Sequence, residues 1–593
     1  MWPVAGVSVA RTAGTEGDEA AVSSKLFRCA CVRRWLPLAY REELYQVLRL
    51  TGPLLLSRVL YFLLPFVSTI FCGHIGNAEL AGYALASATV AITTTATGYG
   101  FVLACDTLIS QTFGSKNMKR VGVILQRSSL ILLFLCLPCW GLLINTQNLL
   151  LFTGVLSFSQ ICCLSRTCIH NIHGIILPQL YTAAAANIFN LGANYVLIFS
   201  LELGVVGSAI AHSLSQIATC LLLFGYIRWK KLHQQTWEGW STECLQEWGS
   251  YMKLAIPSTF MVCFEWWIWE IGGFLAGVLG EDDLAAQHVL LELGTLSYMF
   301  PLGVHAAACV RVGNALGAGN TTRAILTCKV ALVLSGVLAV FQGIVIAGCK
   351  SVLGYIFTSD EKIVEIVSEN LTVYTFLQFF DALLCVCSGI LVGSGMQKIA
   401  ALSNLVCYYC IGLPVGIALM FAAKLRILGL WLGLLICAFL ETGFFLFLIY
   451  KLNWKKITHK VGCSYLSLNH AQLDTEKAPK ADGYSPVNTQ DQEVKAGHEA
   501  EANNTNTKGA EGDAEQRKKT SSTKTQALLS VSELILRRGL IFLVSVLILA
   551  IGVAFHIAFP VPEPSAHSRA NFTLNRANDS SPTPTPLAPT PNL

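Results

Sequence analysis

Long apolar runs separated by short polar stretches dominate the chain between about Pro53 and Phe559. A run of roughly 20 apolar residues is long enough to cross a bilayer, and only helices suit such runs, because backbone groups in lipid must be paired within their own segment. The pattern predicts thirteen crossings, of which the fourth is the weakest. They lie near residues 51–72, 80–109, 121–144, 149–165, 176–200, 204–227, 253–279, 285–313, 325–348, 366–391, 399–422, 427–451 and 537–559.

The composition also indicates a membrane protein. Hydrophobic residues make up 53% of the chain, charged residues only 13%, and the mean hydropathy is +0.56, which is more apolar than a soluble domain. The formal net charge of +5 lies mostly in loops and tails. The positive charge therefore indicates which loops face the cytoplasm, and we expect no nucleic-acid partner.

Basic residues predict which ends of the helices face the cytoplasm. Clusters of Lys and Arg follow the second, sixth and twelfth crossings, and cytoplasmic loops carry an excess of these residues. The N-terminal tail has no compact apolar segment, so we expect no cleavable signal peptide and a cytoplasmic tail. The clusters are Lys116, Lys119 and Arg120, then Arg228, Lys230 and Lys231, then Lys451, Lys455, Lys456 and Lys460.

The two halves of the membrane region resemble each other. The motif "QTFGSKN" from Gln111 matches "NALGAGN" from Asn314, 203 positions later, and Pro53 matches Pro257 at an offset of 204. Repeats of six helices keep the same membrane orientation, as in one class of transporters. The fold class predicted is therefore all-α and polytopic, with two six-helix lobes in a parallel pseudo-two-fold repeat, a central cavity between them and an additional C-terminal transmembrane helix.

These observations predict the boundaries of the chain's parts. Trp237, Trp240 and Trp248 recur on one helical face, so the connector is expected to be an amphipathic segment at the membrane surface. The polar stretch after the twelfth crossing has little to bury and is expected to be disordered. The parts are a cytoplasmic tail (1–50), an N-lobe (51–227), a connector (228–252), a C-lobe (253–451), a linker (452–536), a thirteenth helix (537–559) and an extracellular tail (560–593).

The N-lobe is shorter than its counterpart. Gly207 matches Gly429 at an offset of 222, so 19 residues are missing relative to the earlier offset of 203, about the length of one membrane helix. The shortened piece is the fourth segment, residues 149–174. Its His170 and His173, with nearby cysteines, match no zinc-binding spacing, and we expect neither a metal nor another cofactor.

The stretch "FEWWIWE" at residues 264–270 places two acids in an apolar helix. Glu265 and Glu270 lie about 12 and 20 Å into the predicted helix, too deep to reach water easily, and five positions place them about 140° apart around the axis. One is expected to line the cavity and the other to face a neighbouring helix. A buried carboxylate is a functional candidate by default, and we consider six acids and two bases within the predicted spans as candidates. These are Asp106, Glu265, Glu270, Glu292, Asp381 and Glu441, with Arg58 and Arg311.

The acids suit an exchange of cations for protons. Burial disfavours the charged form of a carboxylic acid, so such a group can trade a proton for another cation. Glu292 and Asp381 could reach the same cavity, or could be structural acids paired within the protein. Trp266, Trp267 and Trp269 could offer ring faces to an organic cation, or could pack against lipid or core. For these three tryptophans the two interpretations are equally favoured.

The remaining polar residues favour structural interpretations. Asp106 is expected to form a hydrogen bond near its helix end, and Arg58 either reaches the surface or pairs with an acid. No partner or role is predicted for Glu441. A stripe on the fifth predicted helix favours hydrogen bonds to other helices. It consists of Asn187, Asn190 and Asn194.

Several motifs together resemble the multidrug and toxin extrusion (MATE) family, in particular its mammalian branch. They are "FCGHIGNAELAG", "CDTLISQTFGSKN", "FEWWIWEIGGFLAGVLG", "RVGNALGAG", "GSGMQK" and "GLPVGIALMF", between about Leu48 and Lys456. The resemblance implies twelve core helices in two lobes and a non-enzymatic antiporter of the plasma membrane, expected on the apical side, that expels organic cations in exchange for protons.

The resemblance also implies which residues carry transport. The family's essential glutamates fall on Glu265, Glu270 and Glu292, and Asp381 stands where that branch usually has Glu. Gln378 occupies the place of a family histidine. Expected partners are small organic cations, protons and the lipid bilayer. The alternative is an isoform without an intact fourth helix that does not transport or is retained in the cell; an ion channel is disfavoured because no ring of filter residues is visible.

Thirteen crossings predict N-glycosylation of the C-terminal tail. Its two sequons, at Asn571 and Asn578, would then lie outside the cell, where glycosylation acceptors are found. Expression in mammalian cells should give a band whose mobility increases after glycosidase treatment and in the Asn571→Gln/Asn578→Gln variant. A protein that reaches the cell surface with no glycosidase-sensitive band would indicate an even number of crossings.

Overall fold

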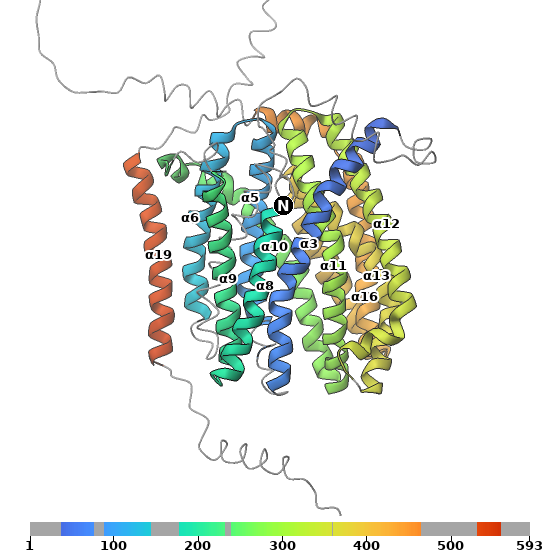
Figure 1. Cartoon of the computed structure of the whole chain (residues 1–593). Helices are drawn as coiled ribbons and strands as arrows, with labels where there is room; N and C mark the ends of the chain where they lie inside the picture. Colours follow the sequence, from blue (N-terminus) through green and yellow to red (C-terminus); the bar gives the residue numbers. More distant parts are fainter. Residues whose placement is uncertain are drawn as a thin grey trace, which may run out of the picture.

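The chain folds as one bundle of long helices. The computed structural model describes residues 37–75, 83, 88–143, 177–231, 239–358, 360–463 and 531–558, and within these ranges twelve helices are long and apolar enough to cross a membrane. Figure 1 shows them side by side, with α19 at one edge. The first lobe contains α3 (Leu38–Ile75), η1 (Ala91–Thr95) with α5 (Ala96–Gly114), α6 (Met118–Leu143), α8 (Leu177–Tyr195) with η2 (Val196–Ser200), and α9 (Gly204–Trp229).

The second lobe follows a short connector. Its helices are α10 (Trp248–Leu279), α11 (Glu281–Gly317), α12 (Thr321–Leu353), α13 (Glu361–Ser394), α14 (Gln397–Asn404) continued by η6 (Leu405–Gly412), α15 (Leu413–Ile417) and η7 (Ala418–Ala422), and α16 (Ile427–Lys451); α19 (Val531–Ala558) comes last. A main apolar core lies where α5 of the first lobe meets α10, α11 and α13 of the second. The lobes are therefore packed directly against each other.

The sequence repeat appears in the structure as reciprocal contacts between α5 and α11. Gly114 lies against the backbone carbonyl of Asn314, and Gly317 lies against that of Gln111. Gly114 and Gly317 are 203 positions apart, as are Gln111 and Asn314. The glycine of each helix therefore contacts the equivalent carbonyl of the other helix. Such reciprocity is the mark of a two-fold axis. The predicted pseudo-two-fold relation between the lobes is confirmed, and the axis passes between these helices, where a Cβ on either glycine would overlap the opposite backbone.

The later part of each lobe repeats at the second offset. The π-helical segments η2 and η7 are 222 positions apart. The residues with positive φ that follow them, Glu202 (φ 53°) and Lys424 (φ 58°), are also 222 positions apart. Gly207 and Gly429 lie against equivalent carbonyls within these segments, those of Leu197 and Leu419. The change of offset therefore arises between α6 and α8, and the shortened fourth segment at 149–165 lies outside the described residues.

Two ion-pair clusters join each lobe's first helix to the opposite lobe. In the Glu43 cluster, Glu43 of α3 accepts hydrogen bonds from Arg311 Nε (2.5 Å) and Nη2 (2.6 Å) of α11, and Arg323 Nε of α12 lies 3.6 Å from it. Thr327 Oγ1 donates to the same carboxylate at 2.6 Å. Glu43 is only 4% exposed, so the cluster is desolvated.

The Glu247 cluster is the repeat counterpart. Glu247, just before α10, accepts hydrogen bonds from Arg120 Nη2 (3.1 Å) and Arg127 Nη1 (3.2 Å), both on α6. Glu43 matches Glu247 at an offset of 204, and Arg323 matches Arg120 at 203. Neither cluster is predicted by the sequence patterns described above. Both lie at the end of the bundle where α5 and α11 finish, which the basic loops predict to be cytoplasmic.

The predicted first helix and connector need correction. Helix α3 begins at Leu38 rather than at residue 51, because the charged residues of its first turns are held by the opposite lobe. Between α9 and α10, the described residues form only the short 3-10 helix η4 (Thr242–Leu245), and Trp248 is buried at the start of α10. The prediction of one amphipathic helix with Trp240 and Trp248 on a single face is wrong. Residues 454–463, predicted as part of the linker, are helical.

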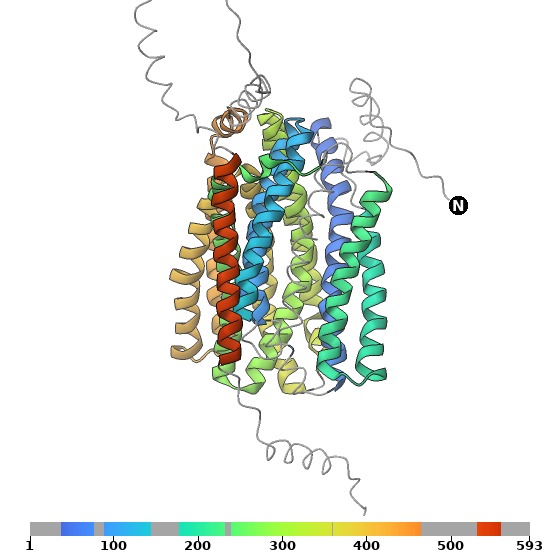
Figure 2. The same cartoon turned by 90° about the vertical axis from the view of Figure 1, so that its left-hand side faces the viewer.

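Helix α19 packs on the first lobe. It lies along α6, as Figures 1 and 2 both show, with Gly552 against the backbone of Gly141 and Phe542 5.3 Å from Phe134 between ring centroids. Arg538 lies 4.4 Å from the ring centroid of Trp248 and donates to the Leu245 carbonyl at 3.1 Å. Close contact at small residues is how membrane helices associate without a hydrophobic driving force. The C-terminal helix is therefore anchored to the first lobe and the connector.

The Glu43 cluster predicts a large stability effect of one substitution. Glu43→Gln should leave Arg311, which is 10% exposed, as an uncompensated buried charge, and removing one partner of a buried pair typically costs about 3–5 kcal/mol. We expect a clearly lower thermal midpoint for the purified variant in detergent. Glu365→Gln, at an exposed position of α13, is the matched control and should change nothing. An unchanged midpoint for Glu43→Gln would show that the cluster does not stabilise the described state.

Candidate functional site

The two acids of "FEWWIWE" occupy different environments on α10. Tyr298 of α11 donates a hydrogen bond from its hydroxyl to Glu265 Oε1 at 2.9 Å, and the Glu265 side chain is partly exposed. Glu270 is also partly exposed and forms no hydrogen bond or ion pair with any residue in the part of the chain that the structure describes. The two acids, predicted to point in different directions, thus differ in their contacts. Glu265 is bound by a tyrosine of the neighbouring helix α11, whereas Glu270 is not.

Two further acids of the second lobe lie close to Glu265. The charge of Glu265 acts on Asp381 of α13 and on Glu441 of α16, and Asp381 also acts on Glu441. The charges of all three acids also act on Tyr408 of η6. We call Glu265, Asp381 and Glu441 the second-lobe acids. Within the described ranges, none of the three forms an ion pair with Lys or Arg.

Glu292 lies apart from the second-lobe acids. It is partly exposed on α11, and the groups whose charges interact with it are His288, one turn earlier on the same helix, and Tyr83 near the start of the second crossing. The structure therefore brings Glu265 and Asp381 together, and brings neither Glu270 nor Glu292 to them. Of the four predicted site residues, two form a cluster and two stand alone in the described state.

The three tryptophans near these acids have partners within the fold. Trp266 stacks on Tyr99 of α5 with ring centroids 5.8 Å apart, and Trp267 Nε1 donates to the Ile92 carbonyl at 3.1 Å. The third, Trp269, lies 5.7 Å from Trp431 in the core of the second lobe. The first two therefore carry contact between the lobes. These contacts favour packing over direct binding of a cation, although their ring faces remain candidates.

Asp106 is placed differently from expectation. It lies eight residues before the end of α5, and its Oδ1 is buried without a hydrogen-bond partner among the described residues. The charge of Arg58 on α3 acts on it. The predicted helix-end hydrogen bond is wrong for this oxygen, and of the two interpretations of Arg58, the structure favours attraction to an acid.

The asparagine stripe on α8 joins helices of the first lobe, as predicted. Asn187 and Asn190 donate to the carbonyls of Leu60 and Leu64 on α3, at 2.7 and 3.0 Å. Hydroxyls of α9 donate in turn to the side-chain oxygens of Asn190 and Asn194. These donors are Ser215 and Ser208, at 3.1 and 3.0 Å. The stripe therefore serves contact between helices, and Asn187 Oδ1 stays buried without a hydrogen-bond partner among the described residues.

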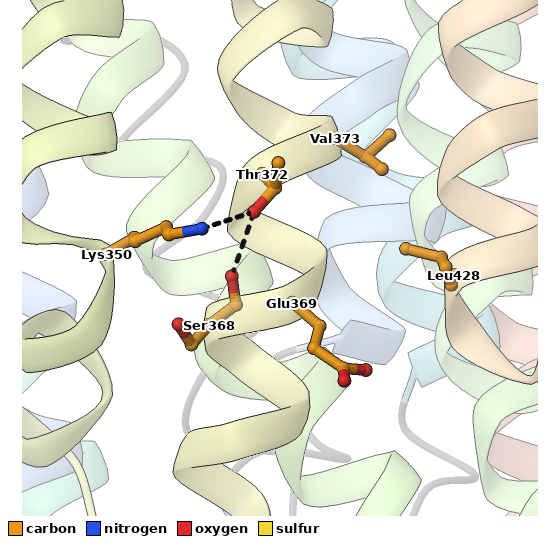
Figure 3. A pocket seen from close by; sticks show the side chains of 6 residues that line it. All are labelled: Lys350, Ser368, Glu369, Thr372, Val373 and Leu428. Atoms are coloured by element: carbon orange, nitrogen blue, oxygen red, sulfur yellow. Dashed lines mark hydrogen bonds between the residues drawn. The ribbon is translucent and has the colours of Figure 1, made fainter.

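One shallow pocket lies away from the predicted acids. It opens between α12, α13 and the start of α16, with a volume of about 430 Å³, and Figure 3 shows Lys350 donating a hydrogen bond to Thr372 across it (3.0 Å) beside Glu369. Glu369 is exposed and Lys350 is partly exposed at its edge, and none of the predicted site residues lines it. No group of three metal-binding side chains occurs in the residues described; His170 and His173 fall outside them.

Comparison with known proteins decides the family. The MatE family model matches residues 53–157 and 257–418, so its two matches begin at the two prolines of the repeat. Multidrug and toxin extrusion protein 1 of Danio rerio is 47% identical over 551 residues, covering 88% of this chain and 92% of that protein. The chain belongs to the multidrug and toxin extrusion family. The MATE resemblance noted from the motifs is therefore confirmed.

Other MATE proteins agree in sequence and in fold. The protein of the same name from Homo sapiens is 42% identical, covering 91% of this chain and 96% of that protein. The crystal structure of the eukaryotic MATE transporter AtDTX14 superposes with a TM-score of 0.68 at 26% identity, covering 71% of this chain and 99% of that chain. As a MATE protein, the chain is a multi-pass membrane transporter rather than an enzyme.

The tyrosines near these acids are not predicted by the sequence patterns. Tyr298 and Tyr408 are ordinary aromatic residues in apolar helices, and only the rotation of α11 and η6 about their axes directs them toward the acids. Glu441 was noted without a role, because the sequence does not show which helices lie beside α16. A polar residue deep in an apolar run was the only available signal, and it identified the acid but not its neighbours.

Proposed function

We propose that this protein is an antiporter that expels organic cations and drugs across the plasma membrane in exchange for protons. The proposal is supported by the names of its relatives, multidrug and toxin extrusion proteins, and by one observation above all: acids gathered in the second lobe without ion-pair partners in the described ranges. An ionised carboxylate inside a membrane protein needs a positive counterpart. An organic cation and a proton can each supply it.

Exchange follows from competition for the same carboxylates. When Glu265 and Asp381 are ionised, their charges attract a cation strongly, because the surroundings have a low dielectric constant. Protonation removes these charges, and the attraction disappears with them. One site that holds either a cation or a proton therefore couples two opposite movements. Glu270 and Glu292, partly exposed and apart from the cluster, would contact the cation along its path or bind protons in another state of the cycle.

Alternating access would come from rocking of the two lobes against each other at the contact between α5 and α11. Proteins of this type move repeats as nearly rigid bodies around a fixed site. The Glu43 and Glu247 clusters and the glycine contacts all lie at the predicted cytoplasmic end. They would close that end in the described state, so opening it requires both clusters to separate.

Transport of a model cation tests the proposal. Cells that express the chain should take up labelled tetraethylammonium, and the initial rate should increase when an outward proton gradient is imposed. Glu265→Gln, Asp381→Asn and Glu270→Gln should each reduce the rate at least tenfold at equal surface expression, because losing about 1.4 kcal/mol of attraction already costs tenfold. Glu365→Gln on the surface of α13 should transport normally.

The results also separate the competing functions. Uptake that ignores the gradient while surface protein is normal would contradict proton coupling. Absence of uptake, with a full-length MATE protein active in parallel, would favour the non-transporting isoform suggested by the shortened fourth segment. Normal rates for Glu270→Gln would remove that residue from the mechanism and leave the second-lobe acids as the site.

A further inference from the structure

A groove on the outside of the second lobe follows helix α13, which packs on α12 along one side and on α16 along the other. Accessible side chains recur every three or four residues along α13, so they lie on one face of the helix. Glu365, Glu369 and Thr372 form the polar part of this face, near the start of the helix. Phe376, which is 62% exposed, and the partly exposed Phe379 continue it toward the middle. The face thus changes from polar to apolar along its length.

The polar part of the groove carries two opposite charges that do not pair. Lys350 of α12 donates a hydrogen bond to Thr372 at 3.0 Å, whereas Glu369 lies on the other side of α13, toward Leu428 of α16, as Figure 3 shows. Both charged side chains line the same pocket of about 430 Å³. Among the residues described, neither forms an ion pair. The protein therefore offers a cation and an anion separately at one rim.

The apolar part of the groove is a second hollow between α12 and α13. Its volume is about 410 Å³, and every side chain that lines it is apolar. The distance from Thr372 to Phe379 along α13 is about 10 Å, at 1.5 Å per residue. In a membrane, hydrocarbon covers such a surface, because its exposure to water is unfavourable. The residues of the hollow are Val333, Gly336, Val337 and Val340 of α12, with Phe379 of α13.

The two parts of the groove have the same order as the parts of a bilayer lipid. Helix α12 begins near Arg323, in the Glu43 cluster, and ends near Lys350, so the polar rim lies at the opposite end of the bundle. Lys350 has three N–H donors and uses one on Thr372, so two remain for a phosphate group. Glu369 can bind an ammonium group on the same headgroup. A headgroup with a negative charge alone would leave Glu369 unpaired and would be repelled by it.

We propose that this groove binds a zwitterionic phospholipid from the leaflet that the basic loops predict to be extracellular. Its phosphate binds Lys350, its ammonium group binds Glu369, and an acyl chain lies along Phe376 and the apolar hollow. Asp381 is nine positions after Thr372, which is half a turn away around the helix. The lipid therefore supports from outside the helix that carries one of the second-lobe acids. Binding does not depend on the proposed antiport.

Native mass spectrometry of the purified protein tests the headgroup contacts. The protein is titrated with phosphatidylcholine and with phosphatidylglycerol, whose headgroup has the phosphate but no ammonium group. The wild type should bind phosphatidylcholine about threefold more tightly, as one partly exposed ion pair provides. Glu369→Gln should remove this preference, and Lys350→Met should weaken the binding of both lipids. Glu365→Gln, on the same face but outside the pocket, is the matched control and should behave as the wild type.

A phosphatidylcholine with a photoreactive group in its acyl chain tests the apolar part. Its cross-links should map to residues 333–340 and 376–379. Gly336→Leu should reduce them, because the new side chain fills the hollow; its Cβ has room, with the nearest atom, Leu383 Cδ2, at 3.9 Å. Should Gly336→Leu not fold, Val337→Phe replaces it, at a position that is 62% exposed in the same hollow.

Three results would overturn the lipid site. The first is equal binding of the two lipids by the wild type, and the second is cross-links confined to other helices. The third concerns glycerophosphocholine, which has the same headgroup without acyl chains and should not displace the lipid at equal concentration. Displacement would show that the polar pocket takes a soluble zwitterion instead. A preference for phosphatidylcholine that is lost in Glu369→Gln, together with cross-links in the hollow, would establish the site.

Discussion

Ion pairs that cross between the lobes are the interaction on which the described state depends. Glu43 holds the first turns of α3 against α11 and α12, and Glu247 holds the start of α10 against α6. Both carboxylates are largely or partly shielded from water, so the lobes can separate there only by replacing each contact with solvent. The glycine crossing of α5 and α11 depends on the same closure, because the two backbones touch only while the lobes are held together.

The charges inside the bundle are distributed unequally between the lobes. In the first lobe, the buried acid Asp106 has the cation Arg58 acting on it. In the second lobe, Glu265, Asp381 and Glu441 have tyrosines and one another as neighbours, with no ion pair among the described residues. A balanced pair contributes to structure, whereas an unbalanced cluster has an affinity for positive charge. In the proposed antiport, similar backbones would therefore serve different purposes: the first lobe would provide a frame and the second the binding chemistry.

Much of the fold could be predicted from the sequence because hydrophobic length and repetition act through simple geometry. The match of Gln111 and Gly114 with Asn314 and Gly317 predicted the two-fold relation, and these residues form the reciprocal contact. The beginning of α3 could not be predicted in this way. Its charged residues resemble a solvated tail until their partner Arg311, 268 positions away along the chain, is known.

The candidate site was predictable in residue type but not in arrangement. A carboxyl group in an apolar helix is recognisable at once, and Glu265 and Asp381 were identified on that basis. Which acids meet depends on how each helix is rotated about its axis, and a difference of one residue turns a side chain by about 100°. Glu270 and Glu292 could thus not be separated from the cluster, and Glu441 could not be assigned to it.

The position of two prolines has a consequence for how the lobes bend. Pro53 and Pro257 each lie ten residues after the carboxylate that binds the opposite lobe, about 15 Å along the helix. Proline removes a backbone hydrogen bond from a helix interior and permits a kink. Helices α3 and α10 thus each consist of a short arm attached to one lobe and a long arm belonging to the other. The two prolines can act as hinges between the arms. Bending at these two equivalent positions would allow the lobes to rotate while every transmembrane segment stays helical.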